Sequence, residues 1–273
     1  MFENCKVPYF YIAMQPFLSL LSIDKTTGLV ADIGHSMASV VPVVEGAVVH
    51  EGVVASDAVS GRQLTDHLMV ILNQREGVSI TNRETARAIK ESLGYVACDY
   101  EGELKLGDWV TKDYTLPDGK VIAVGTERFR CTEPLFQPSL LNQQGSADHE
   151  PQQQQTPAGL TVMVQQALSG CPASVRQDLL RTVMLAGGST QFPNLAQRLK
   201  LELSIDRSSA SSEQATPTGT GEEVTVLAPP TRAWSAWLGG SLLADRDGFR
   251  ETAVSRQEYQ EHGPDILRKK CTN

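Results

Sequence analysis

The stretch LVADIGHSMASVVPVVEG, Leu29–Gly46, contains two runs of small and β-branched residues separated by a short polar turn. This pattern predicts a strand, a tight turn and a second strand. Asp32 and Gly34 stand immediately before the turn, where a glycine lets a ligand approach the backbone. His35 and Ser36 fill the turn, which is unusual for a phosphate-binding loop. The stretch alone leaves three interpretations open: a nucleotide site, the remnant of one, and an ordinary hairpin.

The composition is that of a soluble globular protein, with 273 residues of which 41% are hydrophobic and 21% charged. The formal net charge of -8 argues against the basic surface of a nucleic-acid-binding protein, so we expect no direct nucleic-acid contact. No apolar run approaches the ~20 residues of a membrane helix, and the first residues lack the features of a signal peptide. We therefore expect no membrane partner and a cytoplasmic location.

Strands are expected first along the chain, followed by helices and then by strand–turn–helix units. A buried strand is predicted over residues 8–15, followed by a helix that starts at Pro16. Thr81 and Glu84 fit a capping box at the start of a helix, and Asp118–Gly119 predicts a hairpin turn. The other strands are predicted at residues 26–34, 37–46, 47–54 and 224–230, and the helices at 60–72, 81–97, 160–168, 173–183, from about 193, and 231–244. This order predicts an α/β or mixed α+β protein with a mixed sheet.

Two low-complexity segments interrupt this pattern, at residues 142–159 and 206–223. The first is rich in glutamine and the second in serine, threonine and glycine. Both have few apolar residues, so we expect surface insertions that add nothing to the core.

Three further motifs each have a structural and a functional interpretation. The run Gly187-Gly188-Ser189-Thr190 is either a capped strand-to-helix turn or a backbone that donates to a phosphate or ribose. Lys90 and Glu91 are adjacent opposite charges, typical of a solvated helix face. Gln15, before a helix, is usually structural. The histidines show no metal-binding spacing, and the five cysteines form no CxxC pair, so we expect no metal cluster.

In their order along the chain, these motifs and their surroundings resemble the actin family over nearly the whole length. The segments that carry the resemblance are VPYFYIAMQPFLSLLSIDKTTGLVADIG, SGRQLTDHLMVIL, IKESLGYVACDYE, LPDGKVIAVGTERFRCTEPLFQPS, VMLAGGSTQFPNLAQRL, LAPPTRAWSAWLGGSLLA and SRQEYQEHGPDILRKKC. Several are long and specific, and the two low-complexity segments fall where the family has short connections.

The resemblance implies the actin-like ATPase fold, which is ribonuclease H-like, with mixed sheets, flanking helices and a nucleotide between two related α/β domains. It starts about a third of the way into an actin chain, so an N-terminally truncated actin is expected, without the first part of the N-terminal domain and its phosphate loop. Residues 1–22 and 233–273 would be the remainder of the first domain, and 23–232 the second. The implied cofactor is ATP or ADP with Mg²⁺ or Ca²⁺.

The resemblance also assigns roles to individual residues. Asp32–Ser36 matches the second phosphate loop, and Gln15 matches the residue that helps to place the attacking water. Gln15 and Asp32 are thus the expected catalytic residues, and no protein metal ligand is assigned. The residues expected to bind the nucleotide are Asp32, Gly34, His35, Ser36, Arg87, Lys90, Glu91, Gly187, Gly188, Ser189, Gln191 and Phe192.

Besides Gln191 for Met and Phe192 for Tyr, four substitutions depart from the family pattern. His35 stands where the family has an Asp that holds metal-bound water, and Ser36 replaces a loop glycine. Ser39 replaces the His that helps to orient the water, and Ala233 replaces a Lys that lines the adenine pocket. Phosphoryl transfer depends on positioning and charge stabilisation, so we expect no fast ATP hydrolysis, and whether the chain is an enzyme stays open.

Three functions follow as alternatives. The first is an actin-like cytoskeletal protein that binds nucleotide through a partial cleft and associates with filaments or complexes. The second is a non-hydrolysing actin-related scaffold subunit of a multiprotein complex, such as a chromatin-remodelling or dynactin-like assembly. The third is a degenerate actin fragment. The expected partners are actin-like subunits or cytoskeletal and complex proteins, in the cytoplasm and cytoskeleton, with the nucleus as the alternative location.

Overall fold

A six-stranded mixed sheet forms the centre of the computed structural model, which describes residues 1–142, 157–210 and 224–271. β2 pairs antiparallel with β3 and parallel with β8, while β5 pairs with β3 beside β4. The mixed sheet predicted from the sequence is confirmed. In the order β4-β3-β2-β8-β9, the strands are Ala47–Val48, Ala38–Val44, Gly28–Ile33, Val183–Ala186 and Val226–Leu227, with β5 at Val54–Ser56.

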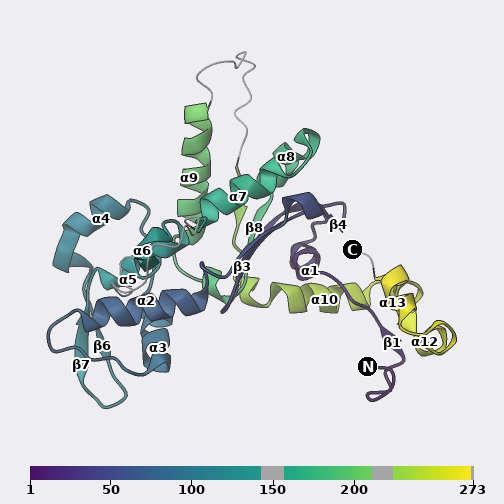
Figure 1. Cartoon of the computed structure of the whole chain (residues 1–273), viewed down its shortest axis with the longest axis horizontal. Helices are drawn as coiled ribbons and strands as arrows, with labels where there is room; N and C mark the ends of the chain where they lie inside the picture. Colours follow the sequence, from purple (N-terminus) through teal and green to yellow (C-terminus); the bar gives the residue numbers. More distant parts are fainter. Residues whose placement is uncertain (143–156, 211–223, 272–273) are drawn as a thin grey trace, which may run out of the picture.

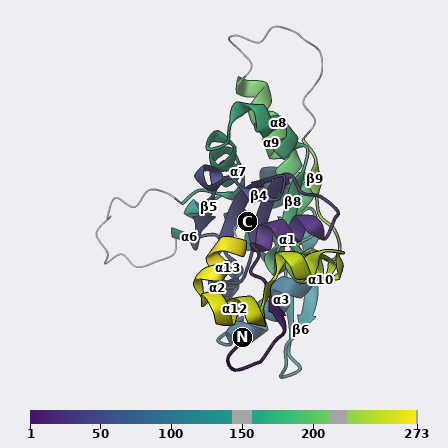
Figure 2. The same cartoon turned by 90° about the vertical axis from the view of Figure 1, so that its right-hand side faces the viewer.

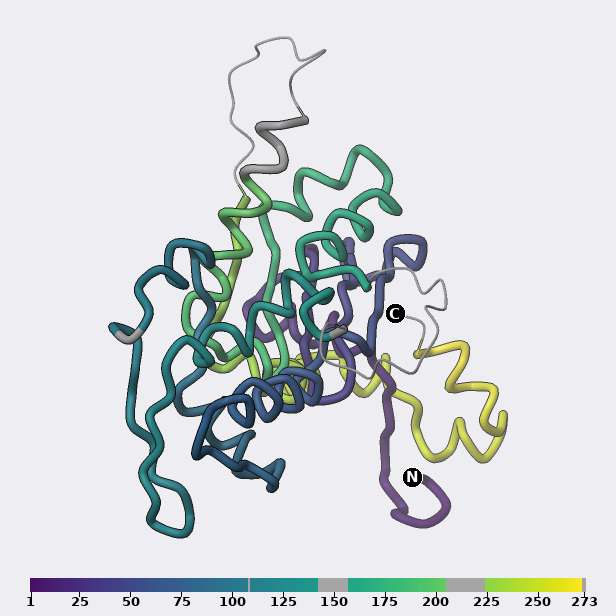
Figure 3. The backbone as a smooth tube through the Cα atoms, turned by 60° about the vertical axis from the view of Figure 1, so that its left-hand side comes forward, coloured from purple at the N-terminus to yellow at the C-terminus, as the bar shows by residue number. Residues whose placement is uncertain are grey.

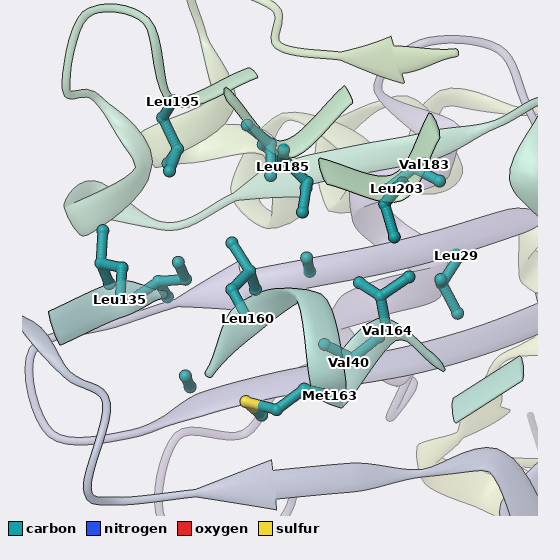
Figure 4. Packing of buried hydrophobic residues seen from close by; sticks show 14 of the residues in the cluster. Leu29, Val40, Leu135, Leu160, Met163, Val164, Val183, Leu185, Leu195 and Leu203 are labelled. Carbon is teal, nitrogen blue, oxygen red and sulfur yellow. The ribbon is translucent and has the colours of Figure 1, made fainter. Parts of the chain in front are cut away.

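One face of this sheet packs against three helices, α7 (Leu160–Ser169), α8 (Ala173–Leu180) and α9 (Leu195–Ala210). Alternate residues of the strands point to this side, among them Leu29 and Leu185, because successive side chains of a strand point to opposite faces. Figure 4 shows these side chains meeting those of α7 and α9 in a continuous apolar core. The helices above the sheet are visible in Figure 1.

The opposite face packs against α1 (Gln15–Leu21), which lies beside α10 (Ser235–Asp245) (Figure 2). Val30 and Met184, which alternate with the residues of the first face, join Leu20 in a second buried cluster. The strands β2 and β8 are therefore buried on both faces. This explains why their sequence is a nearly continuous apolar run instead of an alternation with polar residues.

A third buried cluster lies at one end of the molecule, on the left in Figure 1. It joins α2 (Gly61–Asn73), α3 (Arg83–Leu93) and the hairpin of β6 (Lys112–Thr115) and β7 (Val121–Val124). Gly119 in the turn of this hairpin has a φ of +86°, as the predicted Asp-Gly turn requires. The short helices near this end are α4 (Tyr100–Leu106), α5 (Glu127–Arg130) and α6 (Ser139–Asn142).

The two ends of the described chain lie together on the other side of the sheet (Figure 3). β1 (Tyr9–Phe10) pairs antiparallel with β10 (Val254–Ser255). The ring of Phe2 stacks on that of Tyr259, with their centroids 4.7 Å apart. The C-terminal helices of this group are α11 (Phe249–Thr252), α12 (Arg256–His262) and α13 (Asp265–Lys270).

Several predictions of local structure were wrong. The strand predicted over residues 224–230 is only the two-residue β9, and the helix predicted over 173–183 ends at Leu180. The strand predicted over residues 8–15 is only β1, because its partner β10 offers just two residues for pairing. The strand predicted over 47–54 is broken by a 3₁₀ turn, where Gly52 packs against Pro42 and Ala167. The capping box is wrong as well: Asn82, one residue after Thr81, accepts the backbone N–H of Glu84 at 2.8 Å.

Most of the two predicted insertions, 142–159 and 206–223, lies outside the described residues. Residues 206–210 form the last residues of helix α9. The division into domains 1–22 with 233–273, and 23–232, stays a prediction. None of the described helices is both long and apolar enough to cross a membrane.

Candidate functional site

A pocket of about 460 Å³ opens between segments that are far apart in the sequence. The turn after β2 and the start of α2 form one side, and α3 forms the next. The turn after β8 and the residues before α10 complete it. The lining residues are His35, Gly61, Arg87, Lys90, Glu91, Gly94, Gly188, Ser189, Gln191, Phe192, Pro193, Ala233 and Trp234.

The Gly-Gly turn after β8 is built from two glycines with different tasks. Gly187 has a φ of +88°, and a Cβ at this position would overlap the Asp32 carboxylate. Its backbone N–H donates to the Arg232 carbonyl at 3.0 Å. A Cβ at Gly188, in contrast, would meet no atom within 4 Å. Gly187 is therefore required by the fold, while Gly188 leaves space open in the pocket.

The turn after β2 joins two other walls of the pocket. The carbonyl of Gly34 accepts from the backbone N–H of Gly61 at 3.0 Å and from Ser189 Oγ at 3.1 Å. The carbonyl of His35 accepts from the backbone N–H of Arg62 at 2.8 Å. These bonds fix the start of α2 against the turn after β8 and occupy the first two N–H groups of that helix.

His35, Ser36 and Met37 form the exposed tip of this turn. Their backbone N–H groups have no acceptor among the residues that the structure describes. Successive free N–H groups in a turn can bind an anion. The backbone N–H groups of the tip are therefore able to donate to a phosphate. Of the three residues, His35 lines the pocket, whereas Ser36 and Met37 lie beyond its edge.

Lys90 is a buried cation in the wall of the pocket, with only 5% of its surface exposed. Its Nζ donates to the Gly61 carbonyl at 2.7 Å and to Thr65 Oγ1 at 2.9 Å. Burial lowers the pKa of this ammonium group, and nearby Cys131 and Glu91 oppose the shift. The alternative of a solvated helix face is thus wrong for Lys90. An ammonium group has three donors, so one remains for a ligand.

Glu91, next to Lys90, is exposed at the rim of the pocket. Its Oε1 accepts from Arg87 Nε at 2.8 Å, and Arg87 also lies 3.7 Å from a carboxylate oxygen of Glu84. Exposed ion pairs of this kind contribute little to stability. The three charged side chains can therefore rearrange around a ligand at small cost.

Asp32 lies behind the Gly-Gly turn and does not line the pocket, although it borders Gly187. Burial raises the pKa of this carboxyl group. Among the described residues, no group of three or more His, Cys, Asp and Glu side chains could hold a metal ion. A divalent cation at this site would depend on Asp32 and on oxygens from a ligand or water, an arrangement that Mg²⁺ commonly has.

The structure thus brings together nine of the residues singled out from the sequence, namely eight predicted nucleotide-binding residues and Ala233. The other predicted site residues lie outside the pocket. Asp32, Gly34 and Gly187 support it from behind, whereas Ser36 is at the exposed tip of the turn and Gln15 is exposed at the start of α1. The predicted residues that line the pocket are His35, Arg87, Lys90, Glu91, Gly188, Ser189, Gln191 and Phe192.

Sequence reasoning missed two features of this candidate site. Trp234 lines the pocket, and its position next to Ala233, already placed there by the resemblance, could have identified it. Arg232 braces the Gly-Gly turn, because its guanidinium group donates to the Thr190 carbonyl at 3.0 and 3.1 Å. An arginine after two prolines carries no pattern that would reveal this brace.

Comparisons with known proteins point to one family. The family model described as Actin matches residues 1–83 and 78–272. Putative actin-29 of Dictyostelium discoideum is 32% identical over 278 aligned positions, which cover 99% of this chain and 66% of that protein. The chain therefore spans about two thirds of the length of this curated relative.

Proposed function

Because the chain belongs to the actin family, we propose that it is an actin-like cytoskeletal protein whose pocket binds ATP or ADP. The family match, together with the mixed sheet and its flanking helices, confirms the actin-like α/β fold. The truncation expected from the resemblance stays a prediction. The pocket between the Gly-Gly turn, α3 and the turn after β2 is the single observation that carries the proposed nucleotide binding.

The chemistry of the pocket suits a nucleotide. Its volume lies within the range of small-molecule sites. Lys90 supplies a buried cation with a free donor, and Gly188 leaves room for a flat group against the backbone. The exposed N–H groups at the tip of the turn after β2 would donate to phosphate oxygens. A ligand that combines a flat ring, hydroxyl groups and phosphates matches this set.

The same geometry supports binding without fast hydrolysis. Rapid phosphoryl transfer needs a positioned water and stabilised charge. Gln15, the residue expected to help place that water, is exposed and is not among the described residues that line the pocket. His35 lines the pocket where the resemblance implies a carboxylate. We therefore propose slow turnover, with any Mg²⁺ or Ca²⁺ held mainly by the nucleotide and by water beside Asp32.

Calorimetric titration of the purified chain with ADP and ATP in the presence of Mg²⁺ tests this proposal. Gly188 offers a graded pair of variants, because its Cβ direction is open and its backbone is unstrained. Gly188→Leu should fill the pocket and abolish binding, while Gly188→Ala should retain most of it. No heat of binding to the unmodified chain at millimolar nucleotide, or equal binding by Gly188→Leu, would reject the proposed site.

A non-hydrolysing scaffold is the second candidate, and one observation favours it. The Gly34 carbonyl accepts hydrogen bonds from both α2 and Ser189, so the chain itself joins the walls of the pocket. Such a chain could serve in a multiprotein complex, in the cytoplasm or the nucleus, whether or not nucleotide is bound. Co-sedimentation with actin filaments would favour the cytoskeletal role. A fixed stoichiometric complex that is unaffected by nucleotide would favour the scaffold.

A further inference from the structure

Trp234 is an aromatic side chain that lines the pocket and yet is 72% exposed. Building on the proposed nucleotide binding, we propose that Trp234 is the platform on which the base of a purine nucleotide stacks. We further propose that the pocket accepts adenine and guanine nucleotides with similar affinity. A large exposed aromatic face on a pocket suits a flat aromatic ligand, because stacking on Trp is favourable for any base.

The other aromatic side chain among the described residues that line the pocket is already engaged. Phe192 is only 7% exposed and belongs to the main core cluster. A Cβ at Gly94 would lie 3.0 Å from Cε1 of this ring, so there is no room for a side chain between them. This edge of the ring therefore packs against the end of α3. Phe192 thus helps to form the floor of the pocket, and Trp234 is the aromatic face that remains free.

The backbone that carries Trp234 is held on both sides. On one side, the Arg232 guanidinium group donates to the carbonyls of Thr190 and Ala228, the latter at 3.3 Å. On the other side, the buried Ser235 hydroxyl donates to the Arg232 carbonyl at 3.2 Å and lies 2.9 Å from Ser19 Oγ. The backbone position of Trp234 is therefore set before a ligand binds, so stacking orders only the two side-chain torsions of the indole.

The groups that could read the edge of a base discriminate weakly. Ala233 presents only a methyl group. The side chain of Gln191 lines the pocket and is exposed to solvent. Its amide has both donors and an acceptor, so a rotation of the amide group lets it hydrogen-bond with adenine or guanine. Glu91 accepts only, and it is paired with Arg87. Strong selection between bases requires buried polar groups that the wrong base would leave unpaired. Gln191 and Glu91 are exposed. The buried Lys90 has donors only, and the ring nitrogens of either purine can accept from it.

A protein with a single tryptophan tests the stacking directly. Replacement of Trp109 and Trp237 by Phe leaves Trp234 as the only indole fluorophore, which is titrated with ADP, GDP and CDP. We expect quenching by both purine nucleotides, dissociation constants for ADP and GDP within about tenfold of each other, and CDP weaker than both. A preference for ADP over GDP beyond tenfold would overturn the purine tolerance. Nucleotide binding without any change in fluorescence would overturn the platform.

Matched alanine variants separate this inference from the proposed function. Trp234→Ala should weaken ADP binding by about 5- to 100-fold, and Trp234→Phe should restore most of it. Trp237 is the control, because it is 76% exposed and shares an adjoining apolar groove with Trp234 but does not line the pocket. Trp237→Ala should bind like the unmodified chain. If Trp234→Ala also binds normally, only the platform is rejected. If the unmodified chain binds no nucleotide, the proposed function itself is rejected.

Discussion

Lys90 is the buried cation that lines the pocket. Its ammonium group is buried and donates to two acceptors on α2. Lys90→Met keeps the length of the side chain and removes the charge, so ADP binding should weaken by about 10- to 100-fold, in line with the loss of a charge-assisted hydrogen bond. The free energy of unfolding should change by no more than about 1 kcal/mol, because the lost hydrogen bonds are offset by the removal of a buried charge.

Raising the pH tests the charge of Lys90 in the unmodified chain. Burial lowers the pKa of Lys90, so this side chain should lose its charge at a lower pH than an ordinary lysine. The affinity for ADP should fall as the charge is lost. Lys90→Met should show no such fall. Isothermal titrations across the alkaline range measure this. Lys105→Met, an exposed lysine in the last turn of α4, is the control. Equal affinity of Lys90→Met and the unmodified chain would contradict the role given to Lys90.

Glu133 is a second buried charged residue, and it does not line the pocket. Arg198 reaches it across the core, with Nη2 3.1 Å from Glu133 Oε1, and also pairs with Glu202 at 2.6 Å. Gln137 donates to the same Glu133 oxygen at 3.0 Å, while Oε2 is buried with no partner among the described residues. Burial raises the pKa of Glu133 to about 7, although Arg198 opposes the shift.

This raised pKa predicts a pH dependence of stability. The unfolded chain releases the Glu133 proton near 4.5 and the folded chain near 7, so the folded state binds more protons between these values. The free energy of unfolding should therefore fall as pH rises through this window. Glu133→Gln should remove the fall and, above pH 7, exceed the unmodified chain by on the order of 1–3 kcal/mol.

Urea unfolding measured from pH 4.5 to 8 tests this prediction, with Glu101→Gln, an exposed glutamate of α4, as the control. The Gln variant at 133 keeps an oxygen that can accept from Gln137 and Arg198, so the packing should persist. Parallel stability profiles for Glu133→Gln and the unmodified chain would show that Glu133 does not titrate as proposed.

At the scale of elements, α1 and α10 pack closely because of one glycine. A Cβ at Gly239 would clash with the Leu18 backbone carbonyl, whereas a Cβ at Gly240 comes only within 3.7 Å of Leu18 Cδ1. Gly239→Ala should therefore lower the free energy of unfolding by about 1–3 kcal/mol through overpacking. Gly240→Ala should raise it by about 0.5–1 kcal/mol, because alanine favours the helix. Urea denaturation of both variants measures this, and the same sign for both would refute the packing.

The elements that the sequence predicted well are those with strong periodicity. Leu64, Leu68, Ile71 and Leu72 were placed on one face of a helix, and all four are buried in α2. The hairpin around Leu29–Gly46 was also correct. The strand predicted over residues 8–15 failed because strand pairing depends on a distant partner, which local patterns do not specify.

The candidate site was predictable only in part, for a similar reason. The Gly-Gly turn and the turn after β2 carry local signals, and the structure brings them together. The burial of Lys90 depends on its packing against α2, and the exposure of Trp234 depends on how Arg232 fixes the turn before α10. Neither contact leaves a pattern among neighbouring residues, so tertiary structure was needed to find them.

At the scale of the whole molecule, the sheet supports the pocket from several sides at once. β2 and β8 lie side by side, so the turns that follow them reach the same edge of the sheet. The helices α2 and α3 and the start of α10 close around that edge. Parallel neighbouring strands place their following turns together, which is where ligands commonly bind in α/β sheets.

Hydrogen–deuterium exchange of the whole chain, with and without saturating ADP and Mg²⁺, tests the proposed nucleotide binding most directly. The account predicts slower exchange with ADP in the turn Gly187–Phe192 and in the tip His35–Met37, and no change in the hairpin of β6 and β7. Unchanged exchange in both pocket segments at millimolar ADP, or protection confined to other parts of the chain, would contradict it.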